Sequence, residues 1–230
     1  MYRLNKFLAE QTGVSRREAD NLIADGRVKI NQEVAVLGRR FDETCDEVFL
    51  DGQKITQRKG FTYLILNKPV GYVCSKKRQG DTPTLFELLP EKYQGLKTVG
   101  RLDKDSSGLI LLTNDGDFAF SMTHPKFFKI KSYIVRLNRP LAPLHQQMIS
   151  DMGIDLPDGK SKLFLKKEES DPSGCTFLVE MSEGRNRQIR RTFLSVGYKV
   201  VKLHRIEFGR YTLENLKDGE FKEVEKRWKY

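Results

Sequence analysis

The sequence contains few cysteine and histidine residues. Its three cysteines, Cys45, Cys74 and Cys175, are far apart and odd in number, which excludes a disulfide framework and a paired-cysteine zinc clamp. The three histidines lie in unrelated segments and have no cysteine partners nearby in the sequence. We therefore expect no metal site and a reducing, cytoplasmic location.

Long apolar runs and the common nucleotide-binding motifs are also missing. The first residues lack the apolar core of a signal peptide, and no later run approaches the roughly 20 apolar residues of a membrane span. The sequence contains no GxxxxGK[ST] phosphate loop, no GxGxxG and no HExxH. These absences predict a soluble protein with no membrane partner, and they leave ATP-driven, dinucleotide-dependent and zinc-protease activities without a motif.

What the chain has in excess is positive charge. It contains 41 Lys and Arg against 31 Asp and Glu, a formal net charge of +10, with 38% hydrophobic residues, enough for a packed core. Such an excess favours a polyanionic partner, which could be RNA, DNA or an anionic membrane surface. A solvated lysine-rich surface without a partner is the alternative.

The first part of the chain reads as two short helices followed by a small sheet. Apolar residues at helical spacing predict a helix over residues 3–10, and Ser15 followed by Glu18 is a capping box that starts a second helix. Residues 28–31 alternate like a strand, and residues 48–55 read as a hairpin with an Asp-Gly turn. Basic side chains stand around the helix pair and its exit: Arg16, Arg17, Arg27, Lys29, Arg39 and Arg40.

Residues 2–55 resemble the RNA-binding module first described in ribosomal protein S-four. The run GVSRREAD and the later GRVKIN carry the resemblance, and the sequence departs from the family at Asn31-Gln32, where Asn-Gly is usual. The resemblance implies that this part binds structured RNA. Its candidate contacts are Arg16, Arg17, Arg27 and Lys29. The polar residues 56–60 then read as a linker.

The rest of the chain mixes strands and helices without regular alternation. This predicts an α+β domain with a mixed, mainly antiparallel sheet, and argues against a doubly wound fold. Strands are expected at residues 63–66, 109–113, 131–137, 176–181 and 199–208, and helices at 117–122, 144–152 and 187–196. We place the two domains at residues 1–57 and 61–230.

One dense polar segment, VGRLDKDSSG at residues 99–108, runs into an apolar strand. Its two carboxylates, Asp103 and Asp105, are flanked by Arg101 and Lys104, whose charges would keep an acid ionised, the state that a nucleophile requires. From the residues alone, a charged surface turn is the competing interpretation.

The longer run GRLDKDSSGLILLTNDGD looks like the catalytic signature of pseudouridine synthases, particularly those that modify ribosomal RNA and carry an S-four-like module in front. Three further segments match the same family in order: LNKPVG at 66–71, KSY at 131–133 and EGRNRQIRR at 183–191. The resemblance implies a central sheet with a catalytic cleft across it. It also implies that Asp103 is the nucleophile and that Asp105 structures the loop.

The resemblance assigns roles to other residues. Tyr133 would lie against the target uracil and help to move a proton, and Arg190 would pair with Asp103 through two parallel hydrogen bonds. Leu203 and Arg205 fall where the family has a site-lining Leu-x-Arg. Lys68 is interpreted as structural, with contact to the RNA as a further role. The remaining candidate contacts to the substrate are Arg101, Arg185, Asn186, Arg187 and Arg191.

The sequence thus predicts an enzyme that isomerises a specific uridine in ribosomal RNA, or in a ribosomal subunit precursor, to pseudouridine. The reaction has no net redox change, so no cofactor is expected, and the base must be flipped into a pocket. We favour large-subunit RNA slightly over small-subunit RNA and expect a monomer. The competing hypothesis is a non-catalytic RNA-binding factor in ribosome assembly.

Overall fold

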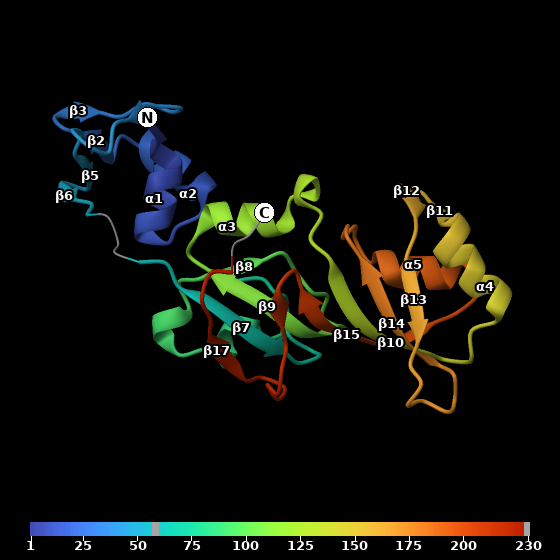
Figure 1. Ribbon diagram of the computed structural model, residues 1–230. Coiled ribbons are helices and arrows are strands. Elements are labelled where there is room, and N and C mark those ends of the chain that lie inside the picture. The colour runs from blue at the N-terminus through green and yellow to red at the C-terminus, as the bar shows by residue number, and fades with distance from the viewer. Residues whose placement is uncertain (57–59, 228–230) are drawn as a thin grey trace. The chain divides into compact units, whose positions relative to one another are not determined.

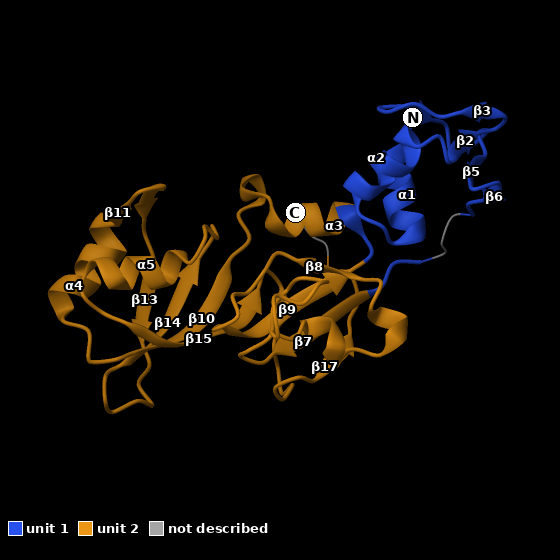
Figure 2. Ribbon diagram, turned by 180° about the vertical axis from the view of Figure 1, so that it is seen from behind, with its two compact units in different colours: residues 1–62, 114–116 blue, residues 63–113, 117–230 orange. Residues whose placement is uncertain are grey.

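The structure is a computed structural model that describes residues 1–56 and 60–227. It divides into two compact units, which Figure 2 colours separately. The N-terminal unit comprises residues 1–62 and 114–116, and the larger unit comprises residues 63–113 and 117–230. The predicted linker at residues 56–60 falls mostly outside the described residues, and the domain boundaries given above stay a prediction. Within the described residues, no helix is both long and apolar enough to cross a membrane.

The N-terminal unit has the predicted pair of helices and small sheet. Ser15 Oγ accepts a hydrogen bond from the Glu18 amide at 3.1 Å, which confirms the predicted start of the second helix. The sheet has the strand order β3-β2-β5-β6 and encloses a core built on Leu4, Leu8 and Val28. The elements of the N-terminal unit are β1 (Tyr2–Arg3), α1 (Leu4–Thr12), α2 (Arg16–Ala24), β2 (Val28–Ile30), β3 (Glu33–Val34), β4 (Arg40–Phe41), β5 (Val48–Leu50) and β6 (Gln53–Lys54).

The two tight turns of this sheet depend on left-handed backbone. Asp51 and Gly52 both have positive φ, 51° and 79°, as expected for the predicted Asp-Gly hairpin. This chain has Asn31-Gln32 where the S-four-like module usually has Asn-Gly, and here Asn31 itself takes the left-handed conformation, with a φ of 55°. Its side-chain oxygen accepts from the Glu47 amide and its side-chain nitrogen donates to Asp46. Asparagine tolerates this conformation because its short polar side chain bonds locally.

The larger unit is built on a mixed sheet with the order β13-β14-β10-β15-β9-β7-β17 (Figure 1), which confirms the predicted fold class. Among the strand pairs of the described residues, β9 and β15 run parallel and the others antiparallel. The strands are β7 (Tyr63–Lys68), β8 (Lys97–Val99), β9 (Ser107–Thr113), β10 (Lys131–Leu137), β11 (Ile154–Leu156), β12 (Gly159–Ser161), β13 (Phe164–Lys167), β14 (Thr176–Met181), β15 (Val200–Phe208), β16 (Tyr211–Thr212) and β17 (Phe221–Glu223).

The central strands are covered on both faces. Leu109 and Leu111 point into one hydrophobic cluster and Ile110 and Leu112 into another, because successive side chains of a strand alternate between its faces. This explains why β9 reads as a continuous apolar run. The helical segments around the sheet are η1 (Leu85–Leu88), η2 (Glu91–Tyr93), α3 (Gly116–Thr123), η3 (Pro125–Phe127), α4 (Pro143–Gln147), the π-helical η4 (Met148–Met152) and α5 (Gln188–Ser195).

A bulge in β15 decides which side chains share a face. Tyr133 of β10 lies opposite Arg205, whereas Ser132 lies opposite Glu207, so that Ile206 is an extra residue on β15. Because of this insertion, Arg205 and Phe208 come to the same side of the sheet as Tyr133. The bulge thus builds part of the floor of the cavity described next.

Candidate active site

A cavity of about 570 Å³ opens in the larger unit where five segments meet. They are the loop before β9, the strands β10 and β15, the loop that leads into α5, and the residues after α3. The cavity brings together many of the predicted site residues: Arg101, Asp103, Tyr133, Arg185, Asn186, Arg187 and Leu203. Lys68, Arg190 and Arg191 are not among the residues that line it.

The loop that carries Asp103 is held by its own backbone and by a neighbouring turn. The Asp103 carbonyl accepts from the Ser106 amide at 3.1 Å, and the Lys104 carbonyl accepts from the Gly71 amide at 2.8 Å. The Asp103 side chain stays about one third exposed, at 35%. The carboxylate therefore faces the cavity from a tightly fixed backbone.

Lys68 lies beneath this loop and makes no contact with solvent. Its side chain is fully buried, and its Nζ donates to the carbonyl oxygens of Ser106 at 2.7 Å and Pro69 at 2.9 Å. Burial lowers the pKa of Lys68, although Cys74 and then Asp103 oppose that shift. The expected RNA contact of Lys68 is therefore wrong, because the ammonium is used inside the protein to hold the Asp103 loop.

The arginine nearest Asp103 is Arg187 and not Arg190. Arg187 Nη1 lies 3.5 Å from Asp103, and the same guanidinium holds Asp105 through two hydrogen bonds of 3.0 and 2.9 Å. Those hydrogen bonds lower the pKa of Asp105. Arg190 forms an ion pair with Asp105 at 3.3 Å and donates to the Asp105 and Val200 carbonyl oxygens.

The predicted pairing of Arg190 with Asp103 is thus corrected to a pairing with Asp105. Arg187 is the residue just before α5 and has a left-handed φ of 47°, which turns its side chain back over the loop of the two aspartates. The structure gives Asp105 the predicted loop-structuring contacts, since two arginines anchor on it.

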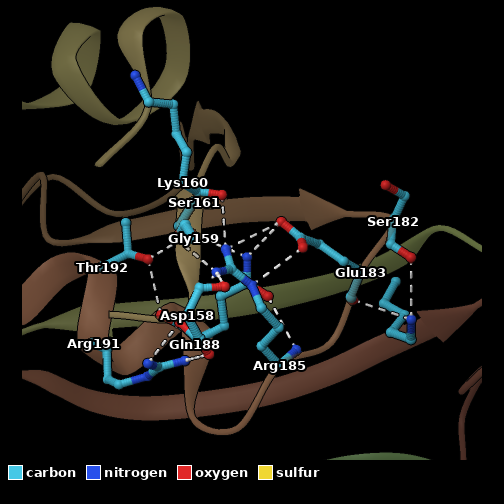
Figure 3. Close-up of polar contacts among 11 residues, drawn as sticks. Asp158, Gly159, Lys160, Ser161, Ser182, Glu183, Arg185, Gln188, Arg191 and Thr192 are labelled. Carbon is cyan, nitrogen blue, oxygen red and sulfur yellow. Dashed lines mark hydrogen bonds and ion pairs between the residues drawn. The ribbon is translucent and has the colours of Figure 1, made fainter. Parts of the chain in front are cut away.

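Arg185 and Arg191 are anchored on the β11–β12 hairpin (Figure 3). Asp158 accepts from Arg191 through two hydrogen bonds, at 2.9 and 2.7 Å, and from Arg185 at 3.1 Å. Arg185 also donates to the carbonyl oxygens of Gly159 and Lys160. Both guanidinium groups, predicted to contact the substrate, are held by this hairpin: Arg185 from the loop between β14 and α5, and Arg191 from α5 itself.

The floor of the cavity contains Arg205, predicted with Leu203 from the resemblance, and also Lys131 and Phe208, to which the sequence reasoning gave no role. Lys131 Nζ donates to the Glu183 carbonyl at 3.1 Å and lies 5.3 Å from the centre of the Phe208 ring. Burial, and next the charge of Arg205, lower the pKa of Lys131 to about 8. Arg205 is 2% exposed, and its Nε donates to the Leu109 carbonyl at 2.7 Å.

These floor residues could have been found from strand periodicity. Lys131 stands two positions before Tyr133, and Arg205 two after Leu203, so each pair shares one face of its strand. Phe208 was hidden by the bulge, which no spacing in the sequence indicates. Together the five side chains give the cavity an apolar surface with two cations.

The predicted contacts of the N-terminal unit differ in how their charge is used. Arg27 pairs with Asp51 through hydrogen bonds of 2.9 and 2.6 Å, so its charge is compensated within the sheet. Arg16 donates to the side-chain oxygen of Asn5 at 3.2 Å. Arg17 and Lys29 are exposed.

The cavity combines groups that suit reactions at a neutral, planar ring. A part-exposed carboxylate supplies a nucleophile, and a tyrosine on the floor supplies both an aromatic surface and a hydroxyl that can move a proton. The Arg187 guanidinium, 3.5 Å from this carboxylate, can fix its direction.

Comparison with known proteins agrees with both parts of the sequence reasoning. Residues 62–195 match the family described as RNA pseudouridylate synthase, and residues 3–48 match the S4 domain. A small-subunit pseudouridine synthase A of Escherichia coli is 37% identical over 227 residues, covering 96% of this chain and 95% of that protein. A large-subunit pseudouridine synthase B of Bacillus subtilis is 34% identical over 228 residues, covering 97% and 92%.

A solved structure shows a similar fold. The crystal structure of a pseudouridylate synthase superimposes with a TM-score of 0.69 at 34% identity, covering 98% of this chain and 96% of that one.

Proposed function

Because the chain belongs to the family of RNA pseudouridine synthases, which are isomerases, we propose that it converts a uridine of ribosomal RNA to pseudouridine with Asp103 as its catalytic carboxylate. The observation that supports Asp103 most directly is its place in the cavity, together with Tyr133, Leu203 and the Arg187 guanidinium. The S4 domain at residues 3–48 supports RNA as the substrate.

The proposed reaction breaks the bond from ribose to uracil nitrogen and rejoins the base through carbon. No electrons are gained or lost and no group is added, so the balance needs no co-reactant. Asp103 attacks the anomeric carbon of the ribose or carbon six of the uracil, or abstracts a ribose proton to give a glycal. Each route needs the Asp103 carboxylate held in a fixed direction, and Arg187 Nη1 lies 3.5 Å from it.

The target base enters the cavity by flipping out of its stack, which costs a few kcal/mol. Cationic side chains at the cavity supply phosphate contacts that offset this cost, and Arg101 lines it from an exposed position. Inside, Tyr133 on β10 offers its ring to the base.

Ribosomal RNA is proposed as the substrate because the full-length relatives carry that substrate in their names. Some are named for the small subunit and others for the large subunit. We favour the large subunit because the GRLDKDSSGLI run resembles that branch more closely.

Pseudouridine mapping of unmodified ribosomal RNAs tests this proposal. The RNAs are incubated with the wild-type protein, with Asp103→Asn and with Asp151→Asn, a change at an exposed aspartate that does not line the cavity. Carbodiimide labelling and reverse transcription then report each modified position. We expect one new stop with wild type and Asp151→Asn and none with Asp103→Asn.

The RNA in which the stop appears also shows whether the substrate is large-subunit or small-subunit ribosomal RNA. A stop that persists with Asp103→Asn would overturn the assignment of the nucleophile. RNA binding by the wild-type protein without any stop would favour the assembly-factor hypothesis.

A further inference from the structure

Next to the cavity, the end of α3 and the residues that follow it carry a group of aromatic rings, Phe120, His124 and Phe127, here called the aromatic platform. Phe120 and His124 are exposed, and Phe127 is half-buried. The Phe120 ring centre lies 4.7 Å from that of His124 and 5.9 Å from that of Phe127. Phe120 is 48% exposed. A contiguous exposed apolar patch of this kind usually marks an interaction site.

The aromatic platform is continuous with the wall of the cavity. Thr123 and Pro125, which alternate with its residues along the chain, line the cavity itself. Phe128 is a further exposed ring just beyond it, at 75% exposure. If one unit of a chain-like ligand enters the cavity, the units next to it therefore lie within reach of these rings.

Local hydrogen bonds hold the platform in one shape. The His124 amide donates to the Phe120 carbonyl at 2.9 Å, and the Phe127 amide donates to the His124 carbonyl at 3.1 Å. The Lys126 amide donates to His124 Nδ1 at 3.3 Å. Because the rings are already ordered, a ligand that stacks on them loses little free energy to their immobilisation.

The charge around the platform suits a polyanion. Lys126 Nζ lies 5.4 Å from the centre of the Phe120 ring and 4.8 Å from that of Phe127. Lys129 follows a few residues later, and the acidic residue nearest to the platform in the sequence is Asp117, in the first turn of α3. Exposed rings interleaved with cations are the arrangement with which proteins hold single-stranded nucleic acid, since bases stack on the rings and phosphates meet the cations.

We propose that the aromatic platform binds the unpaired nucleotides next to the target uridine by stacking, and so guides the single strand into the cavity. This inference rests on the proposed function, because it gives the flanking nucleotides of the same RNA a binding surface. The lysine that lies over two of the rings, Lys126, favours RNA over an apolar protein partner.

The test measures binding of a short, unstructured oligouridylate that contains one 2-aminopurine. Stacking of 2-aminopurine on an aromatic ring changes its fluorescence, and anisotropy of an end label gives the affinity. The variants are a double leucine variant, Phe120→Leu with Phe127→Leu, which keeps the patch apolar but removes both rings, and Phe120→Tyr, which keeps the ring. The matched control is Phe164→Leu on β13, a 61% exposed phenylalanine that does not line the cavity.

We expect the double leucine variant to bind the oligouridylate about tenfold more weakly and to lose the 2-aminopurine signal. Phe120→Tyr and Phe164→Leu should behave like wild type. The same measurements with a fully paired RNA hairpin should show little difference among the variants, because its bases are already stacked on one another.

Unchanged affinity and signal in the double leucine variant would overturn the proposal and favour an apolar protein partner for this patch. Equal losses on single strand and hairpin would also overturn it, since they would show a general defect in RNA binding. The binding assay involves no turnover. A protein that forms no pseudouridine but still shows the 2-aminopurine signal would therefore refute the proposed function and leave the platform standing.

Discussion

Replacement of Lys68 by methionine tests how the Asp103 loop is held. Methionine keeps an unbranched apolar stem of similar length but removes the ammonium that donates to the Ser106 carbonyl at 2.7 Å. Leaving a buried acceptor without its donor costs about 1–3 kcal/mol. The Pro69 carbonyl also loses its hydrogen-bond donor. Burial disfavours the charged form of Lys68 and lowers its pKa, so removal of this buried charge offsets part of the cost.

We expect the free energy of unfolding of Lys68→Met to fall by about 2 kcal/mol. For a chain of this size, such a loss lowers the melting temperature by about 4–8 °C, which circular dichroism measures. The rate of pseudouridine formation at saturating RNA should fall at least about tenfold, because a small displacement of a reacting group is enough to slow chemistry. KM should change little, since Lys68 does not line the cavity.

Lys104→Met is the matched control. Lys104 belongs to the same loop but is exposed, and its Nζ donates to Thr82 Oγ1 at 2.9 Å on the surface. This variant should be within about 0.5 kcal/mol of wild type and fully active. A Lys68→Met protein as stable and as active as wild type would refute the idea that the buried ammonium holds the loop.

Three further outcomes follow from the same contacts. Because the pKa of Lys131 is lowered from 10.5 to about 8, Lys131 loses its charge and RNA affinity should fall as the pH rises through about 8. The free energy of unfolding should rise above that pH, because the unfolded chain still keeps the proton that the folded chain has lost. Lys131→Met should lose both effects in binding and unfolding titrations. Gly108→Ala should lower stability by about 3 kcal/mol in urea unfolding, because Gly108 has a φ of 104° and an added Cβ would lie 2.2 Å from the Arg205 carbonyl oxygen. Asp158→Asn should raise the KM for RNA by loosening the loop before α5. Asp155→Asn, at a position that is 86% exposed on the same hairpin, should have the same kinetic constants as wild type.

Local structure was well predicted where a single physical signal decided it. The Ser15 cap and the Asp51-Gly52 turn are formed by neighbours in the chain, so their residue types were sufficient. The π-helical end of the predicted helix at residues 144–152 was missed, because residue periodicity does not distinguish an α-helix from a wider turn.

The partners of charged side chains could not be predicted in the same way. Arg187 and Arg190 are three residues apart and reach the same loop, and the left-handed backbone at Arg187 decides which of them meets Asp103. Lys68 is a rarer case, since fully buried lysines are uncommon and one of its two acceptors, the Ser106 carbonyl, lies 38 residues away in the sequence. Such pairings depend on elements far apart in the sequence.

The parallel contact between β9 and β15 has a mechanical consequence for catalysis. These strands pair at His204 with Ser107 and at Arg205 with Gly108, whereas their antiparallel neighbours pair over longer stretches. Asp103 precedes β9 on one side of this seam, and Tyr133 belongs to the other side. A small twist about the seam would change the separation of carboxylate and phenol while both half-sheets stay intact. Under the proposed function, an RNA that lay across both halves would damp that twist and hold the Asp103 carboxylate and the Tyr133 phenol at one separation.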